Sequence, residues 1–327
     1  MTNKKLNFIC VAGFGYSGSG ALINLLEEFE NFYVFPREFR LIKDPDGISD
    51  LENALVNNWQ ELKSDIAIRR FKFLIDTCGK KQSLFSKIGY NYDEALNKNF
   101  FISCEKYLKN IINISWKGDW PFHLHELNGL KFFIYRLMRK LNFNPELRDN
   151  MFFSRPGEDF YSFTKVFFDD LFSKINNNRH NYQTIVLDQG IDPYNAHKCS
   201  RYFNNVKAIV VDRDPRDIYI ELCNFSSYPT DSVDDFITFF SNQREAVNKK
   251  YDSKIVLRLK FENLVNNYES EVKKIYSFID FDCKKHLKKF ERFNPSISSK
   301  NIGLWKSNIS SDIKLIEKKL NKYLYIN

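Results

Sequence analysis

The sequence predicts an α/β fold with a doubly wound, mainly parallel sheet of about five strands and a helical insertion. Two observations predict this fold. Continuous apolar runs alternate with segments of helical periodicity, and a loop rich in Gly and Ser directly follows the first of these runs. Continuous apolar runs are typical of parallel strands that helices cover on both faces. A loop between such a strand and a helix turns free backbone N–H groups toward an anion.

The expected elements divide the chain into a sheet and an insertion. Strands are expected at residues 8–12, 31–35, 184–187, 206–211 and 254–259. Pro36 is expected to close the second strand. From about residue 50 to 180 the pattern is mainly helical. We interpret the chain as a single domain over residues 1–327, whose insertion is a candidate region for binding an acceptor.

Composition narrows the function classes. The chain has 43% hydrophobic and 28% charged residues, as an ordinary globular protein has. No stretch reaches the ~20 apolar residues of a membrane span. Six cysteines without a C-x-x-C pair predict reduced thiols in the cytoplasm. The net charge of +8 favours an acidic ligand, but the lysines are spread over helix faces, so nucleic acid is not expected as a partner. The oligomeric state stays open.

The loop after the first strand fits two well-known nucleotide motifs only in part. As a P-loop it has the right glycine spacing, but Ser19 stands at the lysine position and Gly20 at the Ser/Thr position. As a dinucleotide fingerprint, residues 13–18 match G-x-G-x-x-G in full. Glu38 lies at about the distance of a ribose-binding acid. The alternative that the chain is an NAD(P)-binding enzyme therefore stays open.

A third interpretation treats the loop as a cradle for a phosphosulfate. The residues expected to surround the ligand are Gly15, Tyr16, Ser17, Gly18, Ser19 and Gly20. In this interpretation, the hydroxyls of Ser17 and Ser19 take over work that Mg²⁺ does in nucleoside triphosphatases.

A second cluster of charged residues follows the strand at 206–211. Asp214 and Pro215 predict a helix start, with the aspartate as cap and the proline in the first turn. This start places Arg213 and Arg216 at the carboxyl edge of the sheet, beside the Gly/Ser loop. Arginine suits phosphate because its planar fork donates paired hydrogen bonds. The alternative is an ion-pair cluster that only caps the helix.

Together these residues resemble the sulfotransferase family, which uses 3′-phosphoadenosine 5′-phosphosulfate (PAPS). The Ser-Gly loop corresponds to the family's phosphosulfate loop, and Arg213 to its ligand for the 3′-phosphate. Residues 259–265 resemble its strand-to-helix segment, and residues 302–306 its Gly-x-Trp-Lys loop. The resemblance spans residues 8–306.

The resemblance implies a sulfotransferase that moves a sulfuryl group from PAPS to a hydroxyl, without a metal. It implies that Ser299 and Lys300 bind the 3′-phosphate and that Trp305 stacks on adenine, unless Trp305 only anchors its loop. Alternatives are transfer of another group from a related nucleotide, and a non-catalytic module that binds nucleotide or glycan.

Two residues depart from the family's pattern. Tyr16 stands where a basic residue usually steadies the leaving oxygen, so Arg37, Arg40 or Lys43 is expected to substitute. Glu221 stands where the family often has a serine, eight residues after Arg213. A carboxylate there repels a 3′-phosphate unless it turns away or meets a different donor group.

The resemblance also directs the choice of base and acceptor ligands. Predicted catalytic residues are Glu38, Ser17 and Arg37, and predicted acceptor ligands are Glu38, Arg40, Asp188 and Arg155. Glu38 is the favoured base, and its alternative is a surface carboxylate paired with Arg37 or Arg40. His123, His125 and His197 are other possible bases, although histidines in such positions are more often structural.

The insertion holds aromatic side chains that suit sugars or aromatic hydroxyls. They are Trp116, Trp120, Phe152, Phe153 and Tyr161. At helical spacing such residues more often belong to a core. The sequence favours a bacterial, cytoplasmic enzyme that modifies a glycan precursor.

Overall fold

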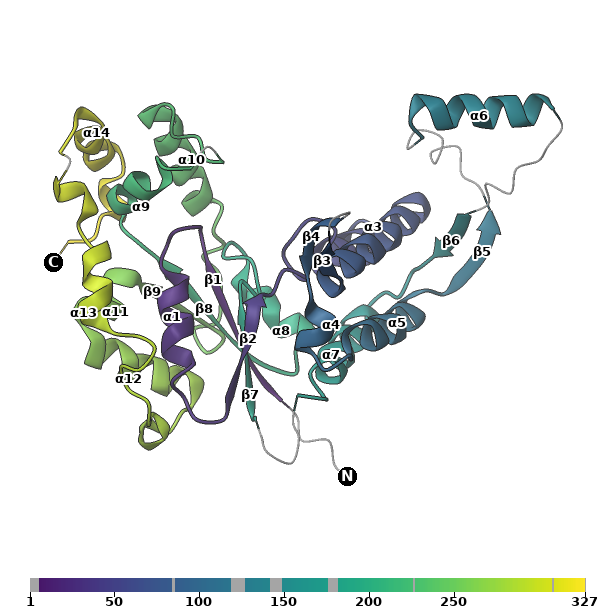
Figure 1. Cartoon of the computed structure of the whole chain (residues 1–327). Coiled ribbons are helices and arrows are strands. Elements are labelled where there is room, and N and C mark those ends of the chain that lie inside the picture. Colours follow the sequence, from purple (N-terminus) through teal and green to yellow (C-terminus); the bar gives the residue numbers. More distant parts are fainter. Residues whose placement is uncertain are drawn as a thin grey trace.

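The structure, a computed structural model, describes residues 6–83, 86–118, 127–141, 149–175, 182–225, 227–307 and 309–326. A five-stranded sheet lies in the middle of the molecule (Figure 1). Its strands follow the order β2 (Phe32–Glu38), β7 (Thr184–Asp188), β1 (Asn7–Gly13), β8 (Asn205–Asp212) and β9 (Val256–Lys260). All neighbours pair in parallel, which confirms the predicted α/β class.

The strand order places β1 at the centre of the sheet. From β1 the chain moves outward to β2, returns through β7, and then passes β1 to reach β8 and β9. Ligands bind open α/β sheets at the carboxyl ends of the strands, where the winding direction changes. The Gly/Ser loop leaves β1 at this point.

Side chains of alternate residues of each strand point to opposite faces of the sheet. Ile9 and Val11 of β1 pack against α1 (Ser19–Leu26), α11 (Phe261–Asn266) and α12 (Tyr268–Ile279). Phe8 and Cys10 pack on the other face, against the helices of the insertion and α8 (Cys199–Tyr202). Both faces are buried, as the continuous apolar runs predicted.

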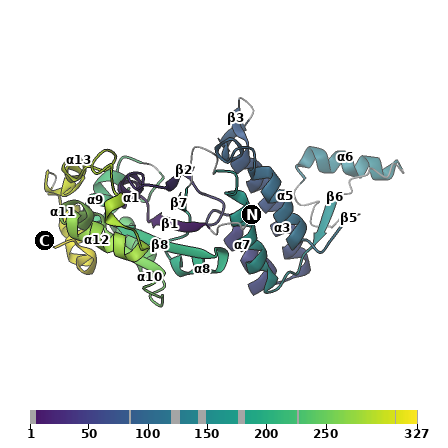
Figure 2. The same ribbon diagram turned by 90° about the horizontal axis from the view of Figure 1, so that it is seen from below.

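The segment between β2 and β7 is mainly helical, as expected from the sequence. Its helices are α2 (Ile48–Glu52), the π-helix η1 (Asn53–Asn57), α3 (Glu61–Gly79), α4 (Tyr92–Ala95), α5 (Phe100–Ile111), α6 (Gly129–Lys140) and α7 (Asp159–Leu171). It also holds two antiparallel hairpins that the sequence analysis did not predict. They join β3 (Lys81–Ser83) to β4 (Ser86–Tyr90) and β5 (Ile114–Gly118) to β6 (Asp149–Phe153). Figure 2 shows β5, β6 and α6 at the end of the molecule farthest from the sheet.

A third apolar cluster lies beside the carboxyl edge of β8. It is built from α9 (Pro215–Leu222), α10 (Val233–Glu245) and α14 (Ser311–Lys319). Shorter elements complete the fold: η3 (Ala196–Lys198), η4 (Cys283–Lys285), α13 (Pro295–Ser298), η5 (Ser299–Asn301), η6 (Leu304–Ser307) and η7 (Asn321–Tyr323). Within the described ranges, no helix combines the length and apolarity that crossing a bilayer requires.

The prediction that Pro36 ends the second strand was wrong. β2 continues through Pro36 to Glu38, with a register shift against β7 after Val34. Proline lacks a backbone N–H but is tolerated in an outer strand at an irregular step. The consequence is that Glu38 belongs to the strand end and pairs in register with Asp188 of β7.

Candidate site for nucleotide binding and group transfer

The Gly/Ser loop is shaped by residues in the left-handed conformation. Gly15, Tyr16 and Gly18 have φ values of 80°, 51° and 86°. Gly18 is the N-cap of α1. A Cβ at Gly18 would lie 2.5 Å from the Cδ2 atom of Phe261, so both the backbone conformation and the packing require glycine.

The loop presents a row of free backbone donors. Among the described residues, no hydrogen bond occupies the N–H groups of Gly15, Tyr16, Ser17, Gly18, Ser19 or Gly20. Ser17 is buried, and its Oγ accepts a hydrogen bond of 3.1 Å from the Phe14 N–H, which fixes the loop from inside. Consecutive free amides beside a helix N-terminus form an anion-binding concavity.

Two glycine substitutions test this geometry. Gly18→Ala is expected to lower the free energy of unfolding by about 1–3 kcal/mol, because it adds backbone strain and a clash with Phe261. Gly20→Ala is the matched control, since a Cβ there meets no atom within 4 Å. Urea denaturation of both variants gives the measurement. Equal stability of Gly18→Ala and wild type would contradict the described loop.

A lysine reaches the loop through a glutamine that the sequence analysis missed. Lys43 Nζ donates to the side-chain oxygen of Gln189. Gln189 Nε2 in turn donates to Ser19 Oγ over 3.2 Å. Burial lowers the pKa of Lys43, and the nearby Arg40 guanidinium adds to this effect. Of the three cations predicted as substitutes, Lys43 is the one that this chain of hydrogen bonds joins to the loop.

The other two predicted cations have different partners. Arg40 binds Asp44 at 2.7 Å and Glu38 at 2.8 Å. Arg37 is exposed. A hydrogen bond from Asn91 is the main cause that lowers the pKa of Glu94, and the charge of Arg37 adds to it. The alternative interpretation of Glu38, as a carboxylate paired with an arginine, therefore holds for Arg40.

Two carboxylates lie side by side at the ends of β2 and β7. Glu38 and Asp188 are register partners. Burial raises the pKa of Asp188 to about 6, with a further contribution from the Glu38 charge. One oxygen of Asp188 is buried without a hydrogen-bond partner among the described residues. A carboxylate with such a pKa can take up a proton near neutral pH, which suits a general base.

The raised pKa of Asp188 predicts a pH-dependent stability. Between about pH 4 and pH 6 the folded chain holds a proton that the unfolded chain has released. The free energy of unfolding therefore falls as pH rises through this window, by at most about 2 kcal/mol. Asp188→Asn is expected to remove this part of the pH dependence in urea titrations, whereas the exposed Glu30→Gln is expected to keep it. An identical slope in Asp188→Asn and wild type would contradict the raised pKa.

Arg213 lies at the predicted edge but is already paired. It is buried, with 3% of its surface exposed. Its Nη1 donates to the Tyr16 carbonyl over 3.1 Å and lies 2.9 Å from a carboxylate oxygen of Glu221. Its Nη2 donates to the carbonyl of Asn301. Glu221 therefore does not turn away from the expected 3′-phosphate ligand but pairs with it.

Asp217 and Glu262 organise the rest of this edge. Asp217 accepts hydrogen bonds from the N–H groups of Gly303 at 2.8 Å and Trp305 at 3.4 Å. Glu262 is fully buried and accepts from the Asp214 N–H at 2.7 Å. Both carboxylates stood inside the recognised motifs, but the N–H groups that donate to them were not predictable from spacing.

Trp305 and Arg216 have structural partners. The Arg216 guanidinium lies 3.9 Å from the centre of the Trp305 ring and is paired with Asp214 and Glu317, each at 2.7 Å. Asp214 caps α9 as predicted, accepting from the Arg216 N–H. One face of Trp305 is therefore covered by Arg216, as an anchoring role requires.

The remaining predicted residues are spread over several elements. Ser299 donates to the Ser296 carbonyl, and Lys300 is exposed in η5, next to Asn301. Arg155 stacks on Trp59 at 4.9 Å, and no described contact joins it to the loop. His197 lies in η3, and burial lowers its pKa.

The aromatic residues of the insertion also have separate settings. Tyr161 donates to Glu52 in the core, whereas Trp116 is exposed on β5. Phe152 is buried, and Phe153 packs edge-on against Trp59. Trp120, His123 and His125 lie outside the described residues.

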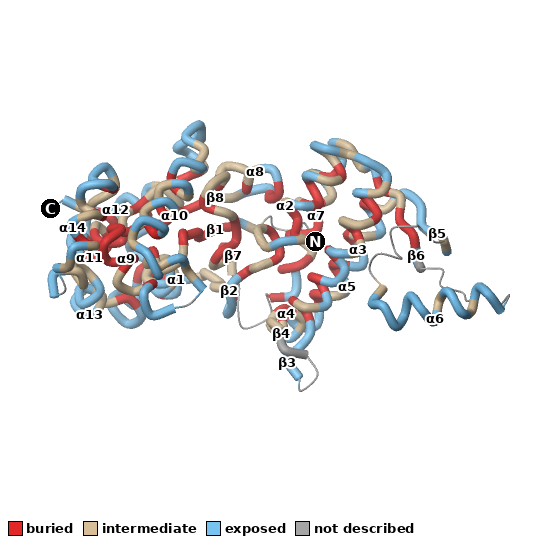
Figure 3. Tube along the Cα trace, turned by 90° about the horizontal axis from the view of Figure 1, so that it is seen from above, coloured by how far each residue is buried: buried red, intermediate tan, exposed pale blue. Residues whose placement is uncertain are grey.

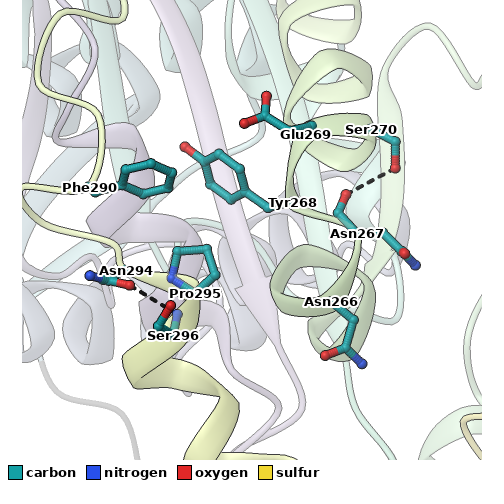
Figure 4. Close-up of a pocket in the computed structure, with 9 residues that line it drawn as sticks. All are labelled: Asn266, Asn267, Tyr268, Glu269, Ser270, Phe290, Asn294, Pro295 and Ser296. Carbon is teal, nitrogen blue, oxygen red and sulfur yellow. Dashed lines mark hydrogen bonds between the residues drawn. The ribbon is translucent and has the colours of Figure 1, made fainter.

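Two cavities lie away from the Gly/Ser loop. A cavity of about 650 Å³ lies between the start of α12 and residues 290–296 (Figure 4). Its described lining includes Tyr268, Phe290 and Asn294, and none of the predicted nucleotide ligands. A smaller cavity of about 330 Å³ is lined by Trp305 and Arg216, among others. Across the described ranges, no group of three or more His, Cys, Asp or Glu side chains is arranged to hold a metal ion.

No family model and no curated protein match the chain. The sulfotransferase domain of the Synechococcus PCC 7002 olefin synthase is similar, with 11% identity over 100% of this chain and 98% of that one, at a TM-score of 0.43. The sulfotransferase domain from the curacin biosynthetic pathway has 11% identity over 98% and 100% of the two chains, at a TM-score of 0.42. Retinol dehydratase in complex with androsterone and the inactive cofactor PAP has 11% identity over 99% and 84%, at a TM-score of 0.36. The solved structures thus include sulfotransferases, and at these identities the likeness concerns the fold alone.

Proposed function

We propose that this protein transfers a sulfuryl group from PAPS to a hydroxyl group. The observation that carries the proposal is the row of free backbone N–H groups at Gly15 to Gly20, with Lys43 joined to Ser19 through Gln189. Two carboxylates, Glu38 and Asp188, end the neighbouring strands at the same edge. Anion donors, a cation and candidate bases are the parts that in-line transfer of a charged group requires.

The loop fits the phosphosulfate end of the donor. The amides of residues 15–20 and the hydroxyls of Ser17 and Ser19 would hold its non-bridging oxygens. The lysine and the metal-binding hydroxyl of a P-loop are replaced by Ser19 and Gly20, which makes hydrolysis of ATP or GTP the weaker interpretation.

The 3′-phosphate end requires a rearrangement. Arg213 would bind this phosphate, with Ser299 and Lys300 beside it, but its guanidinium is paired with Glu221 at 2.9 Å. A phosphate and a carboxylate compete for the same donors, so Glu221 has to leave Arg213 when the nucleotide binds. Because Arg213 also holds the Tyr16 carbonyl, the two ends of the nucleotide site share one residue.

Lys43 and the two carboxylates would have separate roles in the transfer. PAPS, when bound, supplies an activated sulfuryl group and a phosphate leaving group. Lys43 would stabilise the negative charge that develops on the leaving oxygen. Glu38, or Asp188 beside it, would accept the proton of the attacking hydroxyl.

The acceptor is proposed to be a carbohydrate or a glycan precursor in the bacterial cytoplasm. Half of the Glu38 side chain is exposed, which leaves room for a bulky hydroxyl compound beside the base. Arg40 and Asp188 lie next to Glu38 and would bind further hydroxyls. Arg155 and Trp116 of the insertion would contribute only to a long acceptor.

The direct test is a transfer assay without Mg²⁺. The protein is incubated with PAPS and a panel of sugars, glycan precursors and phenols, and release of adenosine 3′,5′-bisphosphate is measured. Binding is measured in parallel with ATP and NAD as controls. A response to NAD alone would support the dinucleotide-binding alternative, and Mg²⁺-dependent binding of ATP a kinase. Binding of oligosaccharide without any nucleotide would indicate a binding module.

Arg213 and Glu221 give a pair of variants with opposite expected effects. Arg213→Ala is expected to abolish binding of adenosine 3′,5′-bisphosphate, because the buried donor is lost. Glu221→Gln is expected to bind this nucleotide about tenfold more tightly, since a charged competitor is removed. Isothermal titration calorimetry measures both. Wild-type affinity in Arg213→Ala, or weaker binding in Glu221→Gln, would contradict the assigned role.

A further inference from the structure

Helix α6 has an apolar face with no partner in the described part of the chain. None of its residues is buried. The exposed fractions of its large apolar side chains include 70% for Leu130, 62% for Phe133 and 48% for Leu137. Figure 3 shows α6 separated from the body of the molecule and almost entirely in the colour of exposed residues. Such a face in water is expected to be covered by something else.

The apolar side chains form one continuous stripe. At 100° per residue, the side chains that fall within an arc of about 140° are Phe133, Leu137, Leu130, Leu141, Ile134 and Met138. Lys131 and Lys140 border this arc on its two sides. Long basic side chains at the edge of an apolar face can extend to the level of lipid head groups while their stems stay apolar.

The charge of this segment has a single sign. Residues 129–141 contain four cations, Lys131, Arg136, Arg139 and Lys140, and no Asp or Glu. The helix is also locally stable at its start, because the side chain of Asn128 caps it by accepting from the Lys131 N–H over 2.9 Å. A capped, basic helix with an apolar stripe is typical of segments that lie in the surface of an anionic membrane.

The position of α6 in the molecule leaves this face accessible. Figures 1 and 2 show α6 beyond the β5–β6 hairpin, at the end of the molecule farthest from the sheet. With 12 residues, α6 is about 18 Å long and too short to span a bilayer. It is suited to lie on a membrane and not to cross it.

We propose that α6 binds the surface of an anionic membrane, with Phe133, Leu137 and Leu130 in the lipid and the basic side chains at the head groups. This inference does not depend on the proposed enzymatic function. A second copy of α6 is a poorer occupant, because two helices with four cations each repel one another. An acidic protein groove would satisfy the charge, and the experiment separates it from lipid.

The test is flotation of the whole protein with vesicles. Vesicles of equal parts phosphatidylglycerol and phosphatidylcholine are expected to carry the protein, and vesicles of phosphatidylcholine alone are not. Leu130→Asp/Phe133→Asp/Leu137→Asp is expected to weaken binding at least about a hundredfold. Lys131→Glu/Arg136→Glu/Arg139→Glu is expected to weaken it by roughly a hundredfold at low salt, since each cation contributes about fivefold.

Matched controls come from other exposed positions. Phe73→Asp removes an exposed apolar side chain from α3, and Lys314→Glu/Lys318→Glu/Lys319→Glu makes the same change of charge on α14. Both are expected to float like wild type. No flotation of the wild type, or an equal loss in the controls, would overturn the proposal. A change of oligomeric state in the α6 variants without lipid would overturn it as well, in favour of a protein interface.

Discussion

Lys43→Met is expected to lower kcat for sulfuryl transfer by about 10²–10³-fold, with little change in the affinity for adenosine 3′,5′-bisphosphate. The lysine is half-buried and is joined to Ser19 through Gln189. In the proposed function, its charge would stabilise the oxygen that becomes negative as the sulfuryl group leaves. An interaction that strengthens only in the transition state changes kcat and not ground-state binding. Methionine keeps most of the side-chain volume and removes the charge.

The control for this substitution is an exposed lysine. Lys109→Met removes a cation that is 73% exposed and paired within its own helix, and it is expected to be fully active. The measurement is kcat from initial rates together with the dissociation constant of the nucleotide. A larger loss of kcat in Arg37→Met than in Lys43→Met would contradict the role proposed for Lys43. It would then be Arg37 that stabilises the leaving oxygen.

Glu38→Gln is expected to lower kcat by about 10²–10⁴-fold, the range that general base catalysis contributes. Glutamine cannot accept the proton of the attacking hydroxyl, but it keeps the shape of the side chain at the end of β2. Nucleotide binding is expected to be unchanged, because no described contact joins Glu38 to the Gly/Ser loop. Initial rates and calorimetry on one preparation give both quantities.

Asp188→Asn decides which of the two carboxylates is the base. In Glu38→Gln the neighbouring negative charge is gone, so the pKa of Asp188 is expected to fall toward its ordinary value. If Asp188 is the base, Asp188→Asn loses activity and Glu38→Gln keeps it with a pH–rate profile displaced to lower pH. Full activity of both variants would contradict a carboxylate base at this edge.

The sheet was predictable because its signals are local. The runs at β1 and β7 are apolar without interruption, that at β8 is broken only by Lys207, and the Gly/Ser loop marks the end of β1. The cap of α9 followed from the sequence Asp214-Pro215 for the same reason. Local signals failed at β2. Pro36 indicated the end of this strand, but β2 lies at the edge of the sheet, where a proline can be accommodated.

The two hairpins of the insertion lacked such signals. β3 has three residues, all exposed, and β5 pairs with β6 across the intervening residues 119–148. Neither strand carries a long apolar run, and the two residues between β3 and β4, Leu84 and Phe85, lack the Asn-Gly type of sequence that marks a tight hairpin. The amphipathic pattern of α6 was readable from the sequence, whereas its lack of a packing partner became visible only in the fold.

The sheet edge at which the candidate residues lie was predictable, and the hydrogen bonds between them were not. The loop and Arg213 follow strand ends, and Glu38 ends β2, so the parallel sheet alone brings them to one edge. Gln189 carries no motif, and only the fold shows that it joins Lys43 to Ser19. The Arg213–Glu221 pair likewise depends on one turn of α9 facing the loop, which spacing alone does not fix.

The most direct measurement uses the glycines of the loop as reporters. The chain has 12 glycines, so selective ¹⁵N labelling gives a simple amide spectrum, in which Gly20→Ala identifies one signal. Saturation with adenosine 3′,5′-bisphosphate is predicted to move the amide signals of Gly15, Gly18 and Gly20 and to leave those of Gly79 and Gly118 in place. If the nucleotide binds and these three amides do not respond, the phosphate is held elsewhere and the proposed site is wrong.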